Sequence, residues 1–305
     1  MARRLTRLIL FFALTATASR AQSPAVPTQR VLPDDRPFST RVSGIFENDL
    51  PQLDPPGAVK FILRPHLGDL IHRDYMRVET GLRWALREDF ELSAEASSFF
   101  THRRRSSTGS GIGKLRFGSR YVFERWPKLG YETTLALSME APVGHAPVDM
   151  TDGHNHLTPS IVIQHLWYSR PRLTTFAGMG LDLLADSSVP GTWGSNQPHD
   201  DSFSFTAGGV YDAGQLKWTL TTTYATTAFI GDRTKHFFYF QPGILWYVPR
   251  KYTFHSKTQW IFGLGAPTAF GPDGNDFSLS SRVRAEITFR QVMSSFRGHQ
   301  SPPSR

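Results

Sequence analysis

The sequence predicts an all-β protein, a membrane-spanning antiparallel up-and-down β-barrel of about 12 strands. Three observations predict this fold. Segments of 10–14 residues alternate apolar and polar side chains, which is the period of a strand with two different faces. The connections between these segments are alternately short and long, as in outer-membrane barrels. The chain also begins with an export signal, so a destination outside the cytoplasm is expected.

The first 21 residues have the three parts of a secretory signal peptide. Arg3, Arg4 and Arg7 precede the apolar run 8–14, and small residues lead to a cleavage site after Ala21. Seven apolar residues are too few to span a bilayer, which needs about 20. A buried N-terminal helix is the alternative. We predict export through the Sec pathway and location in the bacterial outer membrane of a Gram-negative cell.

Composition and charge exclude several functional classes. The 305 residues carry a formal charge of +8, with 34 basic and 26 acidic side chains. Removal of the signal peptide deletes four arginines and no acid, which leaves +4 and removes the main support for a nucleic-acid partner. The absence of cysteine excludes a disulfide scaffold, a thiol nucleophile and any Cys-ligated metal. The 39 aromatic residues argue against global disorder.

Residues 22–57 differ in character from the rest of the mature chain. They contain seven prolines and little periodicity, so we predict an extended, Pro-rich N-terminal segment. Its part 46–51 is expected to enter the barrel as a partial plug, and deletion of the segment should then raise single-channel conductance. The barrel is predicted to occupy residues 58–290, followed by a C-terminal tail at 291–305.

The clearest alternation is in the last segment. Phe277, Val283 and Ile287 share one parity, while Arg284 and Glu286 share the other. Side chains of a strand point alternately to opposite faces, so this pattern predicts a two-faced strand of about 14 residues. Stretch 236–248 is apolar on both parities and leaves its facing open.

Twelve strands are predicted by the same criterion. They are 58–66, 75–85, 90–100, 113–123, 131–141, 157–167, 173–184, 202–211, 216–225, 236–248, 253–263 and 276–290. Short connections are expected at 86–89, 124–130, 168–172, 212–215 and 249–252, and long ones at 67–74, 101–112, 143–156, 185–201, 226–235 and 264–275. The long loops would face outside the cell, and both termini would face the periplasm.

Two soluble folds compete with the membrane barrel. A β-sandwich also alternates, but its strands average five or six residues. A soluble calycin-like barrel would place its apolar face inside. Aromatic side chains near the strand ends favour the membrane, because Trp and Tyr prefer its boundary with water. These are Trp84, Phe90, Phe99, Phe100, Tyr121, Phe123, Tyr131, Trp167, Tyr211, Tyr247 and Phe289.

Several stretches resemble a known group of proteins. The hairpin 81–92 (GLRWALREDFEL), the strand 113–121 (GKLRFGSRY), and the stretches 135–144 and 151–160 carry the likeness. They resemble bacterial outer-membrane transporters in the family of the phenol meta-degradation pathway protein. The resemblance covers roughly residues 75–185, and the barrel pattern continues to 290. It implies a barrel that moves small, hydrophobic or aromatic molecules, and it names no catalytic residue.

Charged side chains occupy the strand faces opposite the apolar stripes. If the apolar faces meet lipid, these side chains project into one lumen, where they line a polar passage or form a salt-bridged plug. The predicted lumen-lining residues are Arg77, Glu79, Arg83, Glu91, Glu95, Lys114, Arg116, Arg120, Glu132, Glu140, Lys217, Lys257, Arg282, Arg284 and Glu286.

Other candidate sites favour a structural interpretation. The cluster His145, Asp149, Asp152, His154, His156, His199, Asp200 and Asp201 could hold a divalent metal only if the loops converge, and solvated loop residues are expected. The basic run 102–105 could meet lipopolysaccharide phosphates, but a solvated loop is the simpler prediction. Stretch 109–114 lacks the spacing of a phosphate loop.

We therefore expect a passive channel or facilitator for small solutes, in contact with outer-membrane lipid and needing no cofactor. A non-transporting structural or surface-binding barrel is the second hypothesis. A lipid-processing barrel enzyme is the third, because His255 and Ser256 are adjacent. No third residue that could orient them is evident, so no catalytic residue is predicted. The sequence does not determine the solute or the oligomeric state.

Overall fold

The computed structural model describes most of the predicted barrel. Described are residues 53–102, 109–126, 128–143, 146, 147, 150, 153–167, 172–187, 201–230, 234–253, 258–271, 274–277 and 280–288, with the backbone alone for 72, 274–277 and 280–288. They belong to the second of two compact units, residues 33–305. The predicted signal peptide, residues 22–52 of the Pro-rich segment and the tail lie outside the described residues.

The described chain is almost entirely β-strand. The strands are β1 (Ala58–Pro65), β2 (Tyr75–Arg87), β3 (Phe90–Thr101), β4 (Gly111–Trp126), β5 (Tyr131–Pro142), β6 (Asn155–Leu166), β7 (Leu173–Ala185), β8 (Ser202–Asp212), β9 (Leu216–Thr226), β10 (His236–Tyr247), β11 (Gln259–Gly265), β12 (Thr268–Gly271), β13 (Gly274–Phe277) and β14 (Ser280–Thr288). A four-residue helix α3 (Asp69–His72) and a 3₁₀ turn η2 (Arg250–Tyr252) complete the elements. Among the described residues, no helix is long and apolar enough to cross a membrane.

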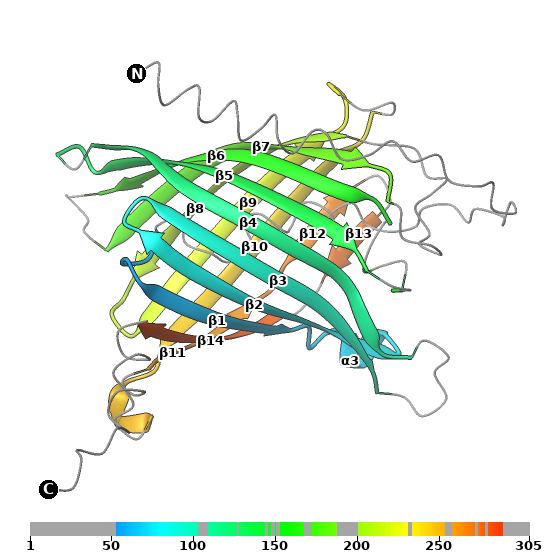
Figure 1. The fold of residues 1–305 in the computed structure, drawn as a ribbon, viewed down its shortest axis with the longest axis horizontal. Helices are drawn as coiled ribbons and strands as arrows, with labels where there is room; N and C mark the ends of the chain where they lie inside the picture. The colour runs from blue at the N-terminus through cyan, green and yellow to red at the C-terminus, as the bar shows by residue number, and fades with distance from the viewer. Residues whose placement is uncertain are drawn as a thin grey trace, which may run out of the picture. The chain divides into compact units, whose positions relative to one another are not determined.

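The strands form one antiparallel sheet (Figure 1). It has twelve strand positions, because β11 and β12 together occupy one position and β13 and β14 another. Strands β1 to β10 pair in sequence order. Gly243 of β10 pairs with Gly265 and Phe240 pairs with Thr268, so β11 and β12 follow one another in a single register. Strands β13 and β14 likewise share one register against β12 and β11. Because β14 pairs with β1, the pairings lead back to the first strand. The predicted fold class and strand number are confirmed.

Two predicted boundaries near the C-terminus are wrong. Residues 250–252 form the turn η2, and β11 starts only at Gln259, so the predicted strand 253–263 begins too early. The predicted long connection 264–275 is largely strand, because the end of β11, all of β12 and the start of β13 lie within it. Its glycines and prolines suggest a loop, but β10 offers a continuous partner. Pairing therefore resumes beyond Pro267, which has no N–H to donate.

The strands are strongly tilted. Following the register partners once around the ring from Ile62 returns to β1 displaced by about 14 residues. For twelve strands, this displacement corresponds to a tilt of about 40° and a backbone radius of about 12 Å. Figure 1 shows the strands crossing the barrel obliquely.

The side-chain faces are those of a membrane barrel. Outward positions are apolar and exposed, such as Phe117 at 59% and Trp218 at 55%, whereas inward Thr206 and Gln241 are 0% and 2% exposed. A soluble barrel would show the reverse distribution, because it needs a dry interior and a wetted exterior. The fold is thus a membrane-spanning barrel with a polar interior, for which lipid supplies the environment of the apolar face.

Two residues of the predicted aromatic belt lie on the inward face: Tyr247, which has the parity of Tyr239 and Gln241, and Phe99, which is the more buried of the two. Phe99 is buried inside the barrel, where its ring contacts Tyr75 edge-on at 6.0 Å between centroids and covers Gly111. A Cβ on Gly111 would lie 3.2 Å from the Phe99 ring, so the glycine makes room for the phenyl group. Parity explains the error, because Phe99 and Phe100 are adjacent and only Phe100 points outward.

Candidate functional site: two walls of the barrel interior

The strand register brings opposite charges face to face on one side of the interior. Along the direct partners of β3, β4, β5 and β6, Glu95 pairs with Arg116, Arg116 with Glu140, and Glu140 with His156. All four point inward, since they share parity with the buried side of each strand. Directly opposed charges attract across a strand pair, so this register is favoured electrostatically.

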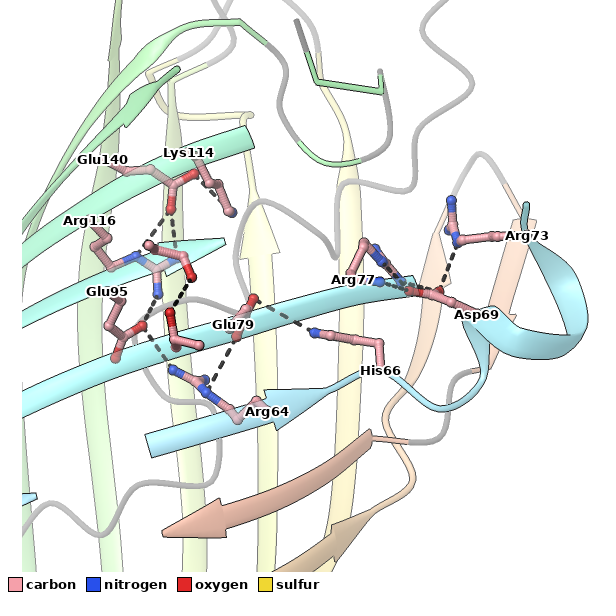
Figure 2. A network of polar contacts seen from close by, with 12 residues as sticks. Arg64, His66, Asp69, Arg73, Arg77, Glu79, Glu95, Lys114, Arg116 and Glu140 are labelled. Carbon is pink, nitrogen blue, oxygen red and sulfur yellow. Dashed lines mark hydrogen bonds and ion pairs between the residues drawn. The ribbon is translucent and has the colours of Figure 1, made fainter. Parts of the chain in front are cut away.

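Arg116 bridges two carboxylates. Its Nε and Nη2 donate to Glu140 Oε2 at 3.1 and 2.7 Å, and its Nη1 donates to Glu95 Oε2 at 3.5 Å. Lys114 Nζ lies 2.9 Å from the other oxygen of Glu140. Figure 2 shows Glu140 between the two basic side chains of β4. Glu140 is therefore held by two cations from one neighbouring strand.

Arg64 joins the same network from β1. Its Nη2 donates to Glu95 Oε2 at 2.8 Å, and its Nε lies 3.3 Å from Glu79 Oε2 (Figure 2). Arg83 approaches Glu95 Oε1 at 3.6 Å, and His66 Nε2 lies 3.7 Å from Glu79 Oε1. Glu95 thus receives three arginines from three strands. We call Arg64, Glu79, Arg83, Glu95, Lys114, Arg116 and Glu140 the ionic wall.

Arg64 and Lys60 are inward-facing cations that the sequence analysis missed. Both are buried, and they alternate along β1 with Phe61, which is exposed. The signal was the alternation along β1, in which Lys60, Ile62 and Arg64 share one face and Val59, Phe61 and Leu63 share the other. The apolar Ile62 in the middle of the polar face obscured it.

Further ionic contacts extend this side of the interior. Arg120 lies 3.6 Å from Glu91, Arg125 donates to Glu132 at 2.9 Å, and Gln164 donates to Glu132 at 3.1 Å. Where the described ion pairs of the interior join two strands, these strands are adjacent or one strand apart. The ion pairs therefore run along the wall.

The prediction that His156 is a loop residue is wrong. It lies in β6, where its Nδ1 contacts both oxygens of Asp182 at 2.9 and 3.1 Å. Thr158 also approaches Asp182, at 3.5 Å. The strand begins at Asn155, so His156, one position before the predicted start at residue 157, already belongs to it. Among the described residues, no group of His, Asp and Glu has the arrangement of a metal site.

Other predicted lumen-lining residues are placed at the barrel ends or only by register. Lys217 Nζ lies 3.1 Å from Asp212 and 4.6 Å from the ring centre of Tyr247. The backbones of Arg284 and Glu286 pair with Ile62 and Lys60 of β1, and that of Arg282 with Gly263 of β11. Lys257 lies outside the described residues, as do His255 and Ser256.

A buried carboxylate holds the connection between β1 and β2. Asp69 of α3 accepts from the backbone N–H and Nε of Arg77 at Oδ2 and from Arg77 Nη2 at Oδ1, each at 2.9 Å. Arg73 Nε also lies 2.9 Å from Oδ1 (Figure 2). Burial raises the pKa of Asp69, but the hydrogen bonds and charge of Arg77 outweigh it and leave the pKa below the ordinary value of 3.8. Arg77, predicted to line the lumen, thus fastens this connection.

Apart from the Lys217–Asp212 pair at the barrel end, the described inward side chains of β8 to β10 are neutral. Inward positions of β8 and β9 carry Ser202, Ser204, Thr206, Thr219, Thr221 and Thr223, which with Gln241 of β10 we call the hydroxyl wall. The hydroxyls of Thr206 and Thr223 are 2.8 Å apart, and Ser204 donates to the carbonyl of Gly180 at 3.4 Å. Phe237 and Tyr239 of β10 also face inward and are buried. The open question of how 236–248 faces is thereby resolved.

The remaining candidate motifs form no site among the residues that the structure describes. Gly111, Gly113 and Lys114 lie in the extended strand β4, so this stretch is not a phosphate-binding loop. The three arginines of the predicted basic patch and loop residues 145, 149, 152, 199 and 200 lie outside the described residues. His154, directly before β6, is buried, and Asp201 accepts from the backbone N–H of Leu184 at 2.8 Å.

Comparison with known proteins supports the fold. No protein-family model and no curated protein matches the sequence, so the resemblance to the phenol-pathway family stays a prediction. Among solved structures, an outer membrane channel from Pseudomonas putida F1 is similar, with 10% identity, a TM-score of 0.51, and coverage of 77% of this chain and 96% of that one. The NanC porin follows with 8% identity, a TM-score of 0.48, and coverage of 75% and 98%.

Proposed function

We propose that this protein is an outer-membrane channel that lets small solutes diffuse passively across the barrel. The observation that carries the proposal is the layout of its interior: polar side chains face inward around the described wall, and the described ion pairs run along that wall. Contacts of this kind stabilise a lined passage without crossing it. The solved outer membrane channel with the same fold supports the proposal.

The interior also limits what passes. Glu91 and Gln241 point inward and are almost fully buried, as are Thr206 and Ser202. A wide aqueous pore would leave such side chains wetted. The proposed passage is therefore narrow and suits small solutes, among which the hydrophobic or aromatic molecules implied by the resemblance are candidates.

Reconstitution tests the proposal directly. We expect purified protein in planar lipid bilayers to give discrete conductance steps, and proteoliposomes to swell in isotonic solutions of small solutes. Swelling should fall steeply as solute size rises. Heat-denatured protein is the matched control. Bilayers that stay as tight as protein-free ones, with correctly folded barrel present, would refute a channel.

One observation favours a second function, a non-transporting barrel. Glu95 is contacted by three arginines, and such a network also rigidifies a scaffold. Under that function, weakening the ionic wall would lower stability and leave bilayer conductance at its background value. The same reconstitution therefore separates the two functions. The channel proposal includes no enzymatic step.

A further inference from the structure

We infer that the ionic wall makes the proposed channel selective for small anions with an aromatic or other apolar body. The inference rests on the proposed channel function and names the solute class that it would favour. Two features carry it: the sign of the charges around Arg116, and the side chains that face this residue across the barrel.

The first feature is a cluster rich in cations. Within the ionic wall, Arg64, Arg83, Lys114 and Arg116 surround three carboxylates, those of Glu79, Glu95 and Glu140. Glu95 is shared by Arg64, Arg83 and Arg116, and Glu140 is shared by Lys114 and Arg116. An incoming carboxylate or sulfonate is attracted to this cluster, because guanidinium groups bind oxyanions through two parallel hydrogen bonds.

The wider distribution of charge has the same sign. Inward positions of β1 to β10 carry nine Lys or Arg residues and seven Asp or Glu residues. The cations are Lys60, Arg64, Arg77, Arg83, Lys114, Arg116, Arg120, Arg125 and Lys217, and the anions are Glu79, Glu91, Glu95, Glu132, Glu140, Asp182 and Asp212. Charges that line a narrow low-dielectric passage bias the ions that enter it.

The second feature is the wall opposite. In a ring of twelve strands, β10 lies six positions from β4, which places it across the barrel. Because the strands are tilted, register partners are not at the same height in the barrel. Halfway round the ring their offset in height is about seven residues, half of the total displacement. This offset puts the neighbourhood of Phe240 level with Arg116. Its inward neighbours are Tyr239 and Gln241.

A solute at this height therefore meets two different surfaces. Its anionic group is attracted to the guanidinium of Arg116, and its apolar body is presented to the ring of Tyr239. A neutral hydroxyl wall beside them repels neither part. An organic cation would instead meet an excess of positive charge, so discrimination depends on sign first and on shape second.

Reversal potentials test the inference on the full-length protein. Under a KCl gradient in planar bilayers, we expect chloride to permeate better than potassium. Arg116→Gln should lower the chloride-to-potassium ratio by about threefold, Arg116→Lys should restore it, and Glu140→Gln should raise it. Thr221→Val on the hydroxyl wall is the control and should leave the ratio unchanged. Heat-modifiable gel migration verifies that each variant is folded.

Substitution of the ions then tests the solute class. We expect benzoate to permeate better than acetate relative to its free diffusion, benzylammonium to be excluded, and Tyr239→Ala to remove the advantage of benzoate. A ratio at or below one in the folded wild type, or no response to Arg116→Gln, would overturn the charge selectivity. Equal behaviour of benzoate and acetate would overturn the apolar part. Absence of any conductance would instead defeat the channel function itself.

Discussion

The two walls of the barrel interior are built by different means. The ionic wall of β1–β5 fills its inward positions with long charged side chains that bind one another across two or three strands. The hydroxyl wall of β8–β10 uses short side chains, and its contacts are single hydroxyl bonds such as Thr206 to Thr223. One wall depends on a shared network, whereas the described side-chain hydrogen bonds of the other are few and separate.

This difference indicates how each wall responds to change. Removing one member of a buried ionic network leaves charged partners in a poorly solvated place, which is costly. Removing one hydroxyl costs only one modest hydrogen bond. The ionic wall should therefore be fragile at single positions and decisive for charge, while the hydroxyl wall should tolerate substitution.

The largest effect is expected for Glu95→Gln. The change removes the charge that Arg64, Arg83 and Arg116 share. A broken buried ion pair costs about 3–5 kcal/mol of folding free energy. Urea unfolding in lipid vesicles, followed by tryptophan fluorescence, measures it. A loss as small as that of a hydroxyl-wall variant would contradict the contrast between the walls.

A smaller, pH-dependent effect is expected in the β1–β2 connection, at the end of the ionic wall. Asp69 has a lowered pKa, so its clamp on Arg77 stabilises the β1–β2 connection above pH 3.8 and is lost as pH falls through the lower folded value. The clamp should contribute about 2 kcal/mol locally. Pepsin cleavage at Leu70 should rise only in strong acid for the wild type.

The matched variant for this clamp is Asp69→Asn. It has no charge to titrate, so its connection should already be cleaved at pH 4, at a rate that varies with pH only as pepsin itself does. Cleavage near Phe229, in the connection after β9, is the internal control for the activity of pepsin at each pH. Identical pH profiles for both proteins would show that the clamp does not hold the connection.

The smallest effect is expected on the hydroxyl wall. Thr206→Val keeps the side-chain shape but breaks the 2.8 Å contact with Thr223. Folding free energy should fall by about 1 kcal/mol, and the ion selectivity should stay that of the wild type. The same urea titration and reversal potential measure both. A shift in selectivity comparable to that of Arg116→Gln would show that this wall also reads charge.

Much of the fold could be predicted from the sequence because it depends on local geometry. Strand parity follows from the two-residue repeat of the extended chain, so Trp218 and Thr219 could be assigned to opposite faces before any pairing was known. The exposure of Trp218 and burial of Thr219 agree with that assignment. The predicted connection 264–275 was wrong because Pro267 and the neighbouring glycines have loop propensity, and only pairing with β10 overrides it.

That charged and apolar side chains occupy opposite faces follows from the order of the residues, since each residue's parity is set by its own strand. Which charges meet depends on how the strands pair in three dimensions. Arg64 reaches Glu95 only because register places β2 between them, and Arg116 is level with Tyr239 only because the strands tilt. The tertiary structure also decided how β10 faces, for both of its parities are apolar. Register and tilt are properties of the closed set of pairings, which no single segment encodes.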